Sequence, residues 1–318
     1  MSPIHRALGL VLGTAADQAF GDPERHHPVA WFGSWATHVE QYTWRDDHRA
    51  GGWFTLAAVI PVVGTALLVE RVAARRGWAE VATTALATWT ALGTRRLAVE
   101  GQVMAQRLRS RDLEAAREQL PNLCGRDPSR LDADGLGRAT VESMAENTND
   151  AGVSTLFWGA VAGVPGIIGH RCLNTLDAMV GHRNERYERF GAVAARLDDA
   201  AAWLPARITG VLACGLAPLV GGDTGRAWRM MRRDHARHPS PNGGWCESAW
   251  AGALGVQLGG ENRYGERVET RPTLGEGPRP RAREVHRAAR LVTVVTWAAA
   301  GIAATVLGGL ALWGRRRR

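Results

Sequence analysis

Carboxylate side chains recur at helical spacing in the middle of the chain, and they are the residues best suited to chemistry. Glu142, Glu146 and Asp150 follow one another at steps of four, so on a helix they share one face. Hard oxygen ligands of this kind suit magnesium, which proteins usually hold with one or two carboxylates and substrate phosphates. The spacing therefore predicts a magnesium-dependent site. The polar residues that join this pattern are Asn147, Asn174, Asp177, Asp198 and Asp199.

The chain contains no lysine, so its basic residues other than histidine are all arginine. A P-loop lysine and a Schiff-base lysine are therefore excluded. Arg183, Arg196 and Arg207 could supply guanidinium forks for a phosphate or a carboxylate. The alternative is that acids and arginines form ion pairs on solvated helix surfaces, such as Asp198 with Arg196. Acidic side chains that lie between membrane-like apolar segments are energetically unfavourable unless they serve a function, which favours a functional site.

Two histidines precede prolines in loops that could meet at one site. His27 follows Asp22 in the turn-rich segment GDPERHHPV, and His238 opens HPSPNGG, which contains Ser240 and Asn242. Such loops are either solvated turns or face a ligand. Neither histidine has the HxxxH spacing of a zinc site, and Ser240 lacks the GxSxG context of a nucleophile. A histidine metal centre is therefore not predicted.

The elements that must position these residues are long apolar helices. Six segments are candidates for crossing a bilayer, at about residues 4–20, 53–69, 80–93, 153–169, 200–220 and 290–314, although 80–93 could be a buried helix instead. Residues 95–140 resemble an amphipathic, soluble helical segment, and residues 266–284 a flexible loop. We therefore expect an all-α, polytopic integral membrane protein. It would form a single membrane-embedded domain over residues 1–318, with polar helices and loops forming the active site.

The net charge of +8 could indicate a nucleic-acid binder, but its distribution argues against that class. Arginines gather at the flanks of apolar segments, as at Arg71, Arg75 and Arg76 and in the run Arg315–Arg318. This arrangement is typical of contact with anionic lipid headgroups. We expect the lipid bilayer, and no nucleic acid, as a partner. The four cysteines show no CxxC spacing, which predicts free thiols in a reducing compartment.

Several motifs from Gly21 to about Tyr264 are similar to those of one family. They are GDPERHHPV, ESMAEN, NTLDAMVGHR, YERFG, ARLDDAAAWLPAR, HPSPNGGW and AWAGALGVQLGG. Together they resemble the adenosylcobinamide-phosphate synthase (CobD/CbiB) family of cobalamin biosynthesis. The resemblance implies a multi-pass enzyme of the cell (inner) membrane with an active site that faces the cytoplasm. Other enzymes of the cobalamin pathway become plausible partners.

The family reaction is the ATP-dependent formation of an amide bond. The remaining free carboxylate of the corrinoid adenosylcobyric acid is joined to aminopropanol or aminopropanol phosphate. The resemblance therefore implies ATP and Mg²⁺, because the carboxylate must be activated, most simply as an acyl phosphate, before the amine attacks it. Phosphoryl transfer depends mainly on positioning and charge neutralisation, which acids, magnesium and arginines provide.

On this basis we expect three sets of site residues. The catalytic set is Glu142, Glu146, Asp150 and Asn147. The magnesium ligands are Glu142, Glu146, Asp177 and Asp198. The substrate-binding set is Asp22, His27, Asn174, Asp177, Arg183, Asp198, Asp199, Arg207, His238, Ser240 and Asn242.

Two other classes of protein remain open. A membrane transporter would use intramembrane acids and helix-breaking glycine and proline as an ion path, but the sequence shows no internal repeat. A magnesium-dependent membrane transferase acting on a phosphorylated substrate would use Asp198 and Asp199, but a full DDxxD motif is missing. Consumption of ATP only in the presence of a corrinoid acid would separate the synthase from both.

Overall fold

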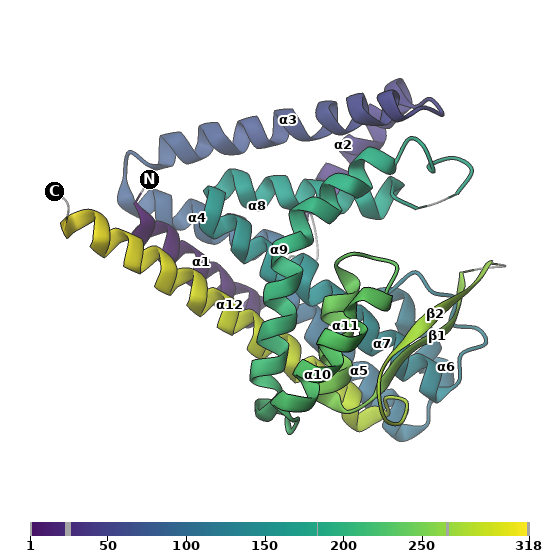
Figure 1. Ribbon diagram of the computed structural model, residues 1–318. Coiled ribbons are helices and arrows are strands. Elements are labelled where there is room, and N and C mark those ends of the chain that lie inside the picture. Colours follow the sequence, from purple (N-terminus) through teal and green to yellow (C-terminus); the bar gives the residue numbers. More distant parts are fainter. Residues whose placement is uncertain (1, 23–26, 183, 265–266, 317–318) are drawn as a thin grey trace. The chain divides into compact units, whose positions relative to one another are not determined.

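The computed structural model describes residues 2–22, 27–182, 184–264 and 267–316, and most of this length is helical (Figure 1). Contacts divide the chain into two compact units. Unit 1 comprises Met1–Gly93, Asp150–Ala202 and Ala299–Arg318, and unit 2 comprises Thr94–Asn149 and Trp203–Ala298. The single membrane-embedded domain expected over residues 1–318 stays a prediction.

Unit 1 consists of helices. They are α1 (Pro3–Phe20), α2 (Pro28–Thr43), α3 (His48–Ala73), α4 (Gly77–Ala91) and α8 (Ser154–Val180), with the start of α9 (Ala192–Leu216) and the end of α12 (Ala282–Arg316). α1 packs against α4, and α3 against α8. Gly9 and Gly13 make the first contact close, because a Cβ at either position would lie 2.5 Å from the Cβ of Thr84 or Thr88.

The segment after α8 is held down by an aromatic core. The rings of Phe54 and Phe190 lie 4.9 Å apart, and both side chains are fully buried. Glu40 of α2 accepts hydrogen bonds from Arg186 at 2.8 Å and from the hydroxyl of Tyr187 at 3.0 Å. The YERFG motif is therefore explained by packing of this segment onto α2 and α3.

Two adjacent glycines of α3 provide a test of that packing. An added Cβ at Gly51 would lie 1.9 Å from the carbonyl oxygen of Phe190, whereas one at Gly52 would meet nothing within 4 Å. We expect Gly51→Ala to lower the free energy of unfolding by about 1–3 kcal/mol, as overpacking does. Gly52→Ala should raise it by up to about 1 kcal/mol through helix propensity. Thermal unfolding of both variants in detergent checks this; equal melting temperatures would contradict the packing described here.

Four helical stretches among the described residues are long and apolar enough to cross a membrane. They are His48–Ala73, Ala133–Val180, Ala192–Val220 and Ala282–Gly314. α3 presents large apolar side chains to its surroundings, including Ile60, Leu68 and Val72, as a lipid-facing helix does. The predicted all-α polytopic membrane fold is confirmed. The predicted spans at 4–20 and 80–93 are helices outside this set: α1 carries Arg6 and Asp17, and α4 has only 15 residues.

Unit 2 combines short helices with a hairpin. Its elements are α5 (Thr94–Ser110), α6 (Leu113–Gln119), η1 (Leu120–Asn122), α7 (Ala133–Asn147), η3 (Ala217–Val220), α10 (Thr224–Asp234), η4 (His235–Arg237), α11 (Gly243–Leu254), β1 (Gln257–Tyr264) and β2 (Arg267–Gly275), with the remaining parts of α9 and α12. The π-helix η2 (Thr148–Val153) follows α7. α11 is buried along nearly all of its length and packs against α10 and α7. Its small residues permit this, since a Cβ at Gly252 would lie 2.6 Å from the Cα of Ala227.

The prediction of a flexible loop over residues 266–284 is wrong. Arg267–Gly275 forms strand β2, which pairs antiparallel with β1 from Gln257↔Gly275 to Tyr264↔Arg267, and α12 begins at Ala282 (Figure 1). The hairpin is anchored at its base, where Leu258 and Leu274 are fully buried. Glycines at 259 and 260 take φ values of +75° and +100° at the irregularity in β1. The many charged residues of this segment favoured a loop, whereas its pairing with β1 depends on residues distant in sequence.

Candidate functional site

The loop before α11 fixes the orientation of His238. The ring Nδ1 of His238 accepts a hydrogen bond from the backbone N–H of Ser240 at 3.1 Å. The hydroxyl of Ser240 accepts from the backbone N–H groups of Asn242 and Gly243, at 3.2 and 3.1 Å. Because Nδ1 is an acceptor, the neutral imidazole carries its proton on Nε2. The HPSPNGG motif therefore sets both the position and the tautomer of this histidine.

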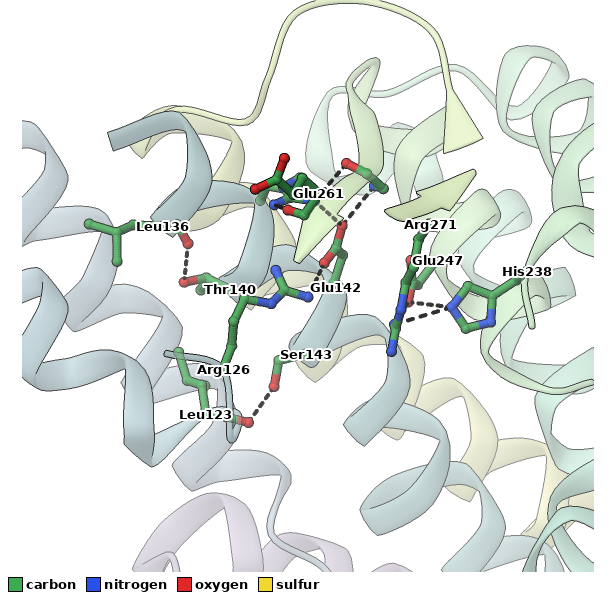
Figure 2. A network of polar contacts seen from close by, with 12 residues as sticks. Leu123, Arg126, Leu136, Thr140, Glu142, Ser143, His238, Glu247, Glu261 and Arg271 are labelled. Atoms are coloured by element: carbon green, nitrogen blue, oxygen red, sulfur yellow. Dashed lines mark hydrogen bonds and ion pairs between the residues drawn. The ribbon is translucent and has the colours of Figure 1, made fainter. Parts of the chain in front are cut away.

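Three side chains of unit 2 meet at the start of α11. A carboxylate oxygen of Glu146 on α7, a ring nitrogen of His238 and a carboxylate oxygen of Glu247 on α11 lie within 4.8 Å of one another. His238 Nε2 is 3.3 Å from Glu247 Oε1, and Arg271 Nη1 of β2 is 3.4 Å from His238 Nε2 (Figure 2). We call these four residues the Glu–His cluster. Gly243 allows the start of α11 to lie close to Glu146, since a Cβ at this position would be only 3.0 Å from Glu146 Oε1.

The Glu–His cluster is deeply buried. Glu247 is 1% exposed and His238 8%, while Glu146 is partly exposed. Burial, followed by the charge of Glu142, raises the pKa of Glu247 to about 8, although Arg271 opposes this. Burial lowers the pKa of His238, so the imidazole is neutral at physiological pH. A carboxylate oxygen of Glu146 lies within 4.8 Å of one of Glu247, and two acids this close favour a state in which one of them keeps its proton.

The raised pKa of Glu247 predicts a pH-dependent stability. An acid whose pKa is higher in the folded than in the unfolded chain destabilises the fold when it ionises. The stability that protonated Glu247 contributes therefore falls as the pH rises from the ordinary pKa of glutamate to about 8. We expect the melting temperature in detergent to decrease between about pH 5 and pH 8. Glu247→Gln should flatten that decrease. A variant with the same pH profile as the wild type would show that Glu247 is not the titrating group.

A metal ion does not fit the Glu–His cluster well. A histidine ligand needs a free lone pair, and the bond from Ser240 leaves the proton of His238 on Nε2, the atom nearest to Glu247. Arg271 also places a fixed positive charge 3.9 Å from Glu247 Oε1. The arrangement favours a carboxylate pair that shares a proton over a cation site.

Glu142 lies next to the cluster and links α7 to the hairpin. Its carboxylate accepts from Arg126 Nη2 at 2.7 Å and from the backbone N–H of Gly259 at 2.7 Å, and Arg138 Nη1 lies 3.9 Å away (Figure 2). All three charged side chains are at least nine-tenths buried. Since both oxygens of Glu142 are engaged, the expectation that it is a catalytic residue and a magnesium ligand is not supported. Its role in this structure is to hold β1 against α7.

Three further predicted residues of unit 2 take supporting positions. Asn147 donates to the carbonyl and hydroxyl oxygens of Ser143, at 2.9 and 3.1 Å. Arg207 donates to the side chain of Asn242 at 2.9 Å, which joins α9 to the loop before α11. Its guanidinium also lies over the ring of Trp203, 4.2 Å from the ring centre. These contacts place Arg207 and Asn242 in the framework of the His238 loop.

The predicted aspartates of the membrane helices gather in unit 1 around one arginine. Arg171 of α8 interacts electrostatically with Asp150, Asp22 and Asp198. Asp198 of α9 is 8% exposed and hydrogen-bonds to Asn174. Its Oδ1 atom has no hydrogen-bond partner among the described residues. The side chains of the aspartate cluster are Asp22, Asp150, Arg171, Asn174, Asp177 and Asp198, with Asp199 interacting electrostatically with Asp177.

The aspartate cluster contains more acidic than basic side chains. Three carboxylates interact with one guanidinium, and one buried carboxylate oxygen lacks a donor among the described residues. Desolvated like charges repel unless a cation joins them. His170, next to Arg171, donates from its Nε2 to the backbone carbonyl oxygen of Asp150 at 2.9 Å. These features fit a divalent cation held by oxygen ligands.

The predicted site residues thus separate into two groups. Glu146, His238 and Ser240 come together in unit 2, and Asp22, Asp150, Asn174, Asp177, Asp198 and Asp199 belong to unit 1. His27 caps α2, where its Nδ1 accepts from the N–H of Val29 at 3.2 Å. Arg183 lies outside the described residues. The predicted magnesium ligands Glu142 and Glu146 therefore belong to one unit, and Asp177 and Asp198 to the other.

Sequence reasoning missed the partners of Glu146. Glu247 stands in WCESAWAGALG, an otherwise apolar and small-residue helix, and an isolated carboxylate in such a helix is a signal of a buried functional group. Arg271 lay in the segment interpreted as a loop. Arg126 and Arg171 were not singled out because arginine is common throughout this chain.

Comparison with known proteins shows one family and several relatives that match most of the chain. The family described as CobD/Cbib protein matches residues 10–292. Cobalamin biosynthesis protein CobD of Mycobacterium tuberculosis is 50% identical over 300 residues, which cover 94% of this chain and 95% of that protein. Proteins of the same name from Rhodobacter capsulatus and Chromobacterium violaceum are each 38% identical. Those alignments cover 88% and 96% of this chain, and 91% and 99% of the relatives. No solved structure matches.

Proposed function

The chain belongs to the CobD/Cbib family and has a role in cobalamin biosynthesis, and from this premise we propose that it is an adenosylcobinamide-phosphate synthase. The proposed enzyme is a ligase that joins the free carboxylate of adenosylcobyric acid to aminopropanol or aminopropanol phosphate. ATP is the co-substrate that activates the carboxylate. Family membership favours this function over a transporter or a transferase.

The observation that carries the proposal is the Glu–His cluster beside the buried arginines of unit 2. Its carboxylate pair, Glu146 and Glu247, suits a substrate that carries an ammonium group. Arg271 at 3.9 Å from Glu247 places a guanidinium in the same cluster, and guanidinium groups bind phosphate and carboxylate. Amide formation brings together a cationic amine and anionic partners, so a site with both signs of charge is what the reaction needs.

Magnesium is assigned to the aspartate cluster. Asp198, with an unpartnered and buried carboxylate oxygen, and Asp150 are the residues we propose as its ligands, with Asp22 and Asp177 close to them electrostatically. When bound, the ion neutralises negative charge on the phosphates of ATP. Arg171 balances part of the acidic charge and, through its bond to Asn174 at 3.0 Å, positions a side chain that contacts Asp198.

We place the enzyme in the cell (inner) membrane as a multi-pass protein whose active site faces the cytoplasm, where ATP is available. The helical stretches long enough to cross a membrane support a membrane protein, and the hydrophilic corrinoid must reach it from the aqueous side. Other enzymes of the cobalamin pathway are the proposed partners for delivery and removal of the corrinoid.

The proposal is tested with the protein purified in detergent or nanodiscs. ATP, magnesium and an amine are supplied with and without adenosylcobyric acid, and the release of ADP or AMP is measured. ATP consumption should require both the corrinoid acid and magnesium. Consumption that is independent of the corrinoid acid, or none with folded protein, would contradict a ligase function.

A further inference from the structure

We propose that the closely spaced carboxylate pair Glu146–Glu247 is the base that removes the proton from the substrate amine before it attacks the activated carboxylate. The inference deepens the proposed function and depends on it. A primary aliphatic amine has a pKa near 10, so at neutral pH it is almost entirely an ammonium ion without a nucleophilic lone pair. The enzyme must therefore supply a proton acceptor close to the bound amine.

The protonation state and the surroundings of the pair suit a proton acceptor. Two carboxyl groups within 4.8 Å of each other, one of them fully buried, cannot both ionise without strong repulsion, so the pair holds one proton, carries one negative charge and can accept one more proton. Glu247 Oε1 accepts no hydrogen bond from the described residues, and His238 Nε2 and Arg271 Nη1 lie 3.3 and 3.9 Å from it. Glu146 is partly exposed, which leaves a side from which an amine can reach the pair.

The groups around the pair act in opposite directions on its protonation, so that neither the neutral nor the singly ionised pair is strongly favoured. Burial and the carboxylate of Glu142 favour the protonated pair, whereas the nearby guanidinium groups favour the ionised pair. His238 cannot take over as the base. Its Nδ1 is engaged by Ser240, and its pKa is lowered by burial. The charged and titratable groups that face Glu247 are Glu142 and Glu146 of α7, Arg138 of α7, Arg126, His238 and Arg271.

The proposed step balances as follows. An N–H bond of the ammonium group breaks, and its proton passes to the ionised carboxylate of the pair. The nitrogen lone pair then forms the C–N bond to the activated carboxyl carbon, whose bond to the oxygen of its phosphate leaving group breaks. That oxygen retains the bonding electron pair. The second proton lost from nitrogen leaves with the phosphate, so the pair ends with one proton more than it began with.

The test uses hydroxylamine, an amine that is already largely neutral at pH 7 and needs no base. The full-length protein is assayed with ATP, magnesium and adenosylcobyric acid, using either aminopropanol phosphate or hydroxylamine as the nucleophile. Glu146→Gln and Glu247→Gln should each lower amide formation from aminopropanol phosphate by about 10²–10⁴-fold. Hydroxamate formation should stay within a few-fold of the wild type. Glu276→Gln, an exposed acid of unit 2, is the matched control and should leave both rates unchanged.

A pH profile adds a second readout. Without the base, the variants depend on amine deprotonated in solution, so amide formation should recover by about tenfold for each unit of increasing pH below the amine pKa. The inference is overturned if both variants keep normal amide formation. It is also overturned if they lose the amide and hydroxamate products equally while remaining folded by circular dichroism. An absence of ATP-dependent hydroxamate from the wild-type protein would instead contradict the proposed synthase function.

Discussion

Asp198→Asn is expected to lower ATP-dependent turnover by about 100-fold or more, because it removes a charged ligand from the proposed magnesium site. Asp198 is 8% exposed, and its Oδ1 has no hydrogen-bond partner among the described residues. Asparagine has nearly the same shape, so the fold should survive and the change should act through charge. Turnover is measured over a range of magnesium concentrations, where the variant should need far more magnesium for half-maximal activity.

The matched control is Glu188→Gln, an exposed acid of unit 1 close in sequence to α9. It should leave both turnover and the magnesium requirement unchanged. An Asp198→Asn variant with the magnesium requirement of the wild type would remove the aspartate cluster from the magnesium site. Asp198 would then be interpreted as part of the structural polar network with Asn174.

The second large effect concerns stability. Glu142→Ala should lower the free energy of unfolding by about 3–5 kcal/mol, because it removes the carboxylate that faces two buried arginine charges. Arg126 and Arg138 are 5% and 6% exposed, and the N–H of Gly259 would also lose its acceptor at 2.7 Å. Denaturant unfolding in detergent, followed by tryptophan fluorescence, measures the change.

Glu114→Ala provides the comparison for that variant. Glu114 pairs with Arg117 in the same unit, but its side chain is 82% exposed, so its loss should change stability by less than about 1 kcal/mol. If Glu142→Ala were as stable as Glu114→Ala, Glu142 would not be the link between α7 and the hairpin. Retained stability with lost turnover would return Glu142 to a catalytic role.

The sequence predicts the helices well because their signals are local. Apolar runs such as 53–69 and 290–314 and helix breakers such as Pro121 depend on near neighbours, and α3 and α12 cover the predicted runs. The hairpin was not predicted, because β1 and β2 are anchored by Leu258, Leu274 and contacts from Arg138 and Arg279. Those contacts are distant in sequence and leave no local pattern in a charged, glycine-rich segment.

In the candidate site, too, local features could be predicted from the sequence and long-range contacts could not. Residues that share a helix face, such as Glu142 and Glu146, could be grouped from their spacing, but their different roles could not be predicted. Glu142 meets Arg126 and Gly259, whereas Glu146, one turn later, meets Glu247. Which partner each acid finds depends on how α11 and β1 pack against α7. One close contact in that packing is at Gly243, where an added Cβ would lie 3.0 Å from Glu146 Oε1.

The most direct test of the central claim, that this chain forms an amide bond in cobalamin biosynthesis, is a product assay. Membranes containing the protein are incubated with adenosylcobyric acid, ATP, magnesium and either aminopropanol or aminopropanol phosphate, and the corrinoids are analysed by mass spectrometry. We predict the amide product with at least one of the two amines, and none when ATP is omitted. Unchanged adenosylcobyric acid with both amines, from folded protein, would contradict the account.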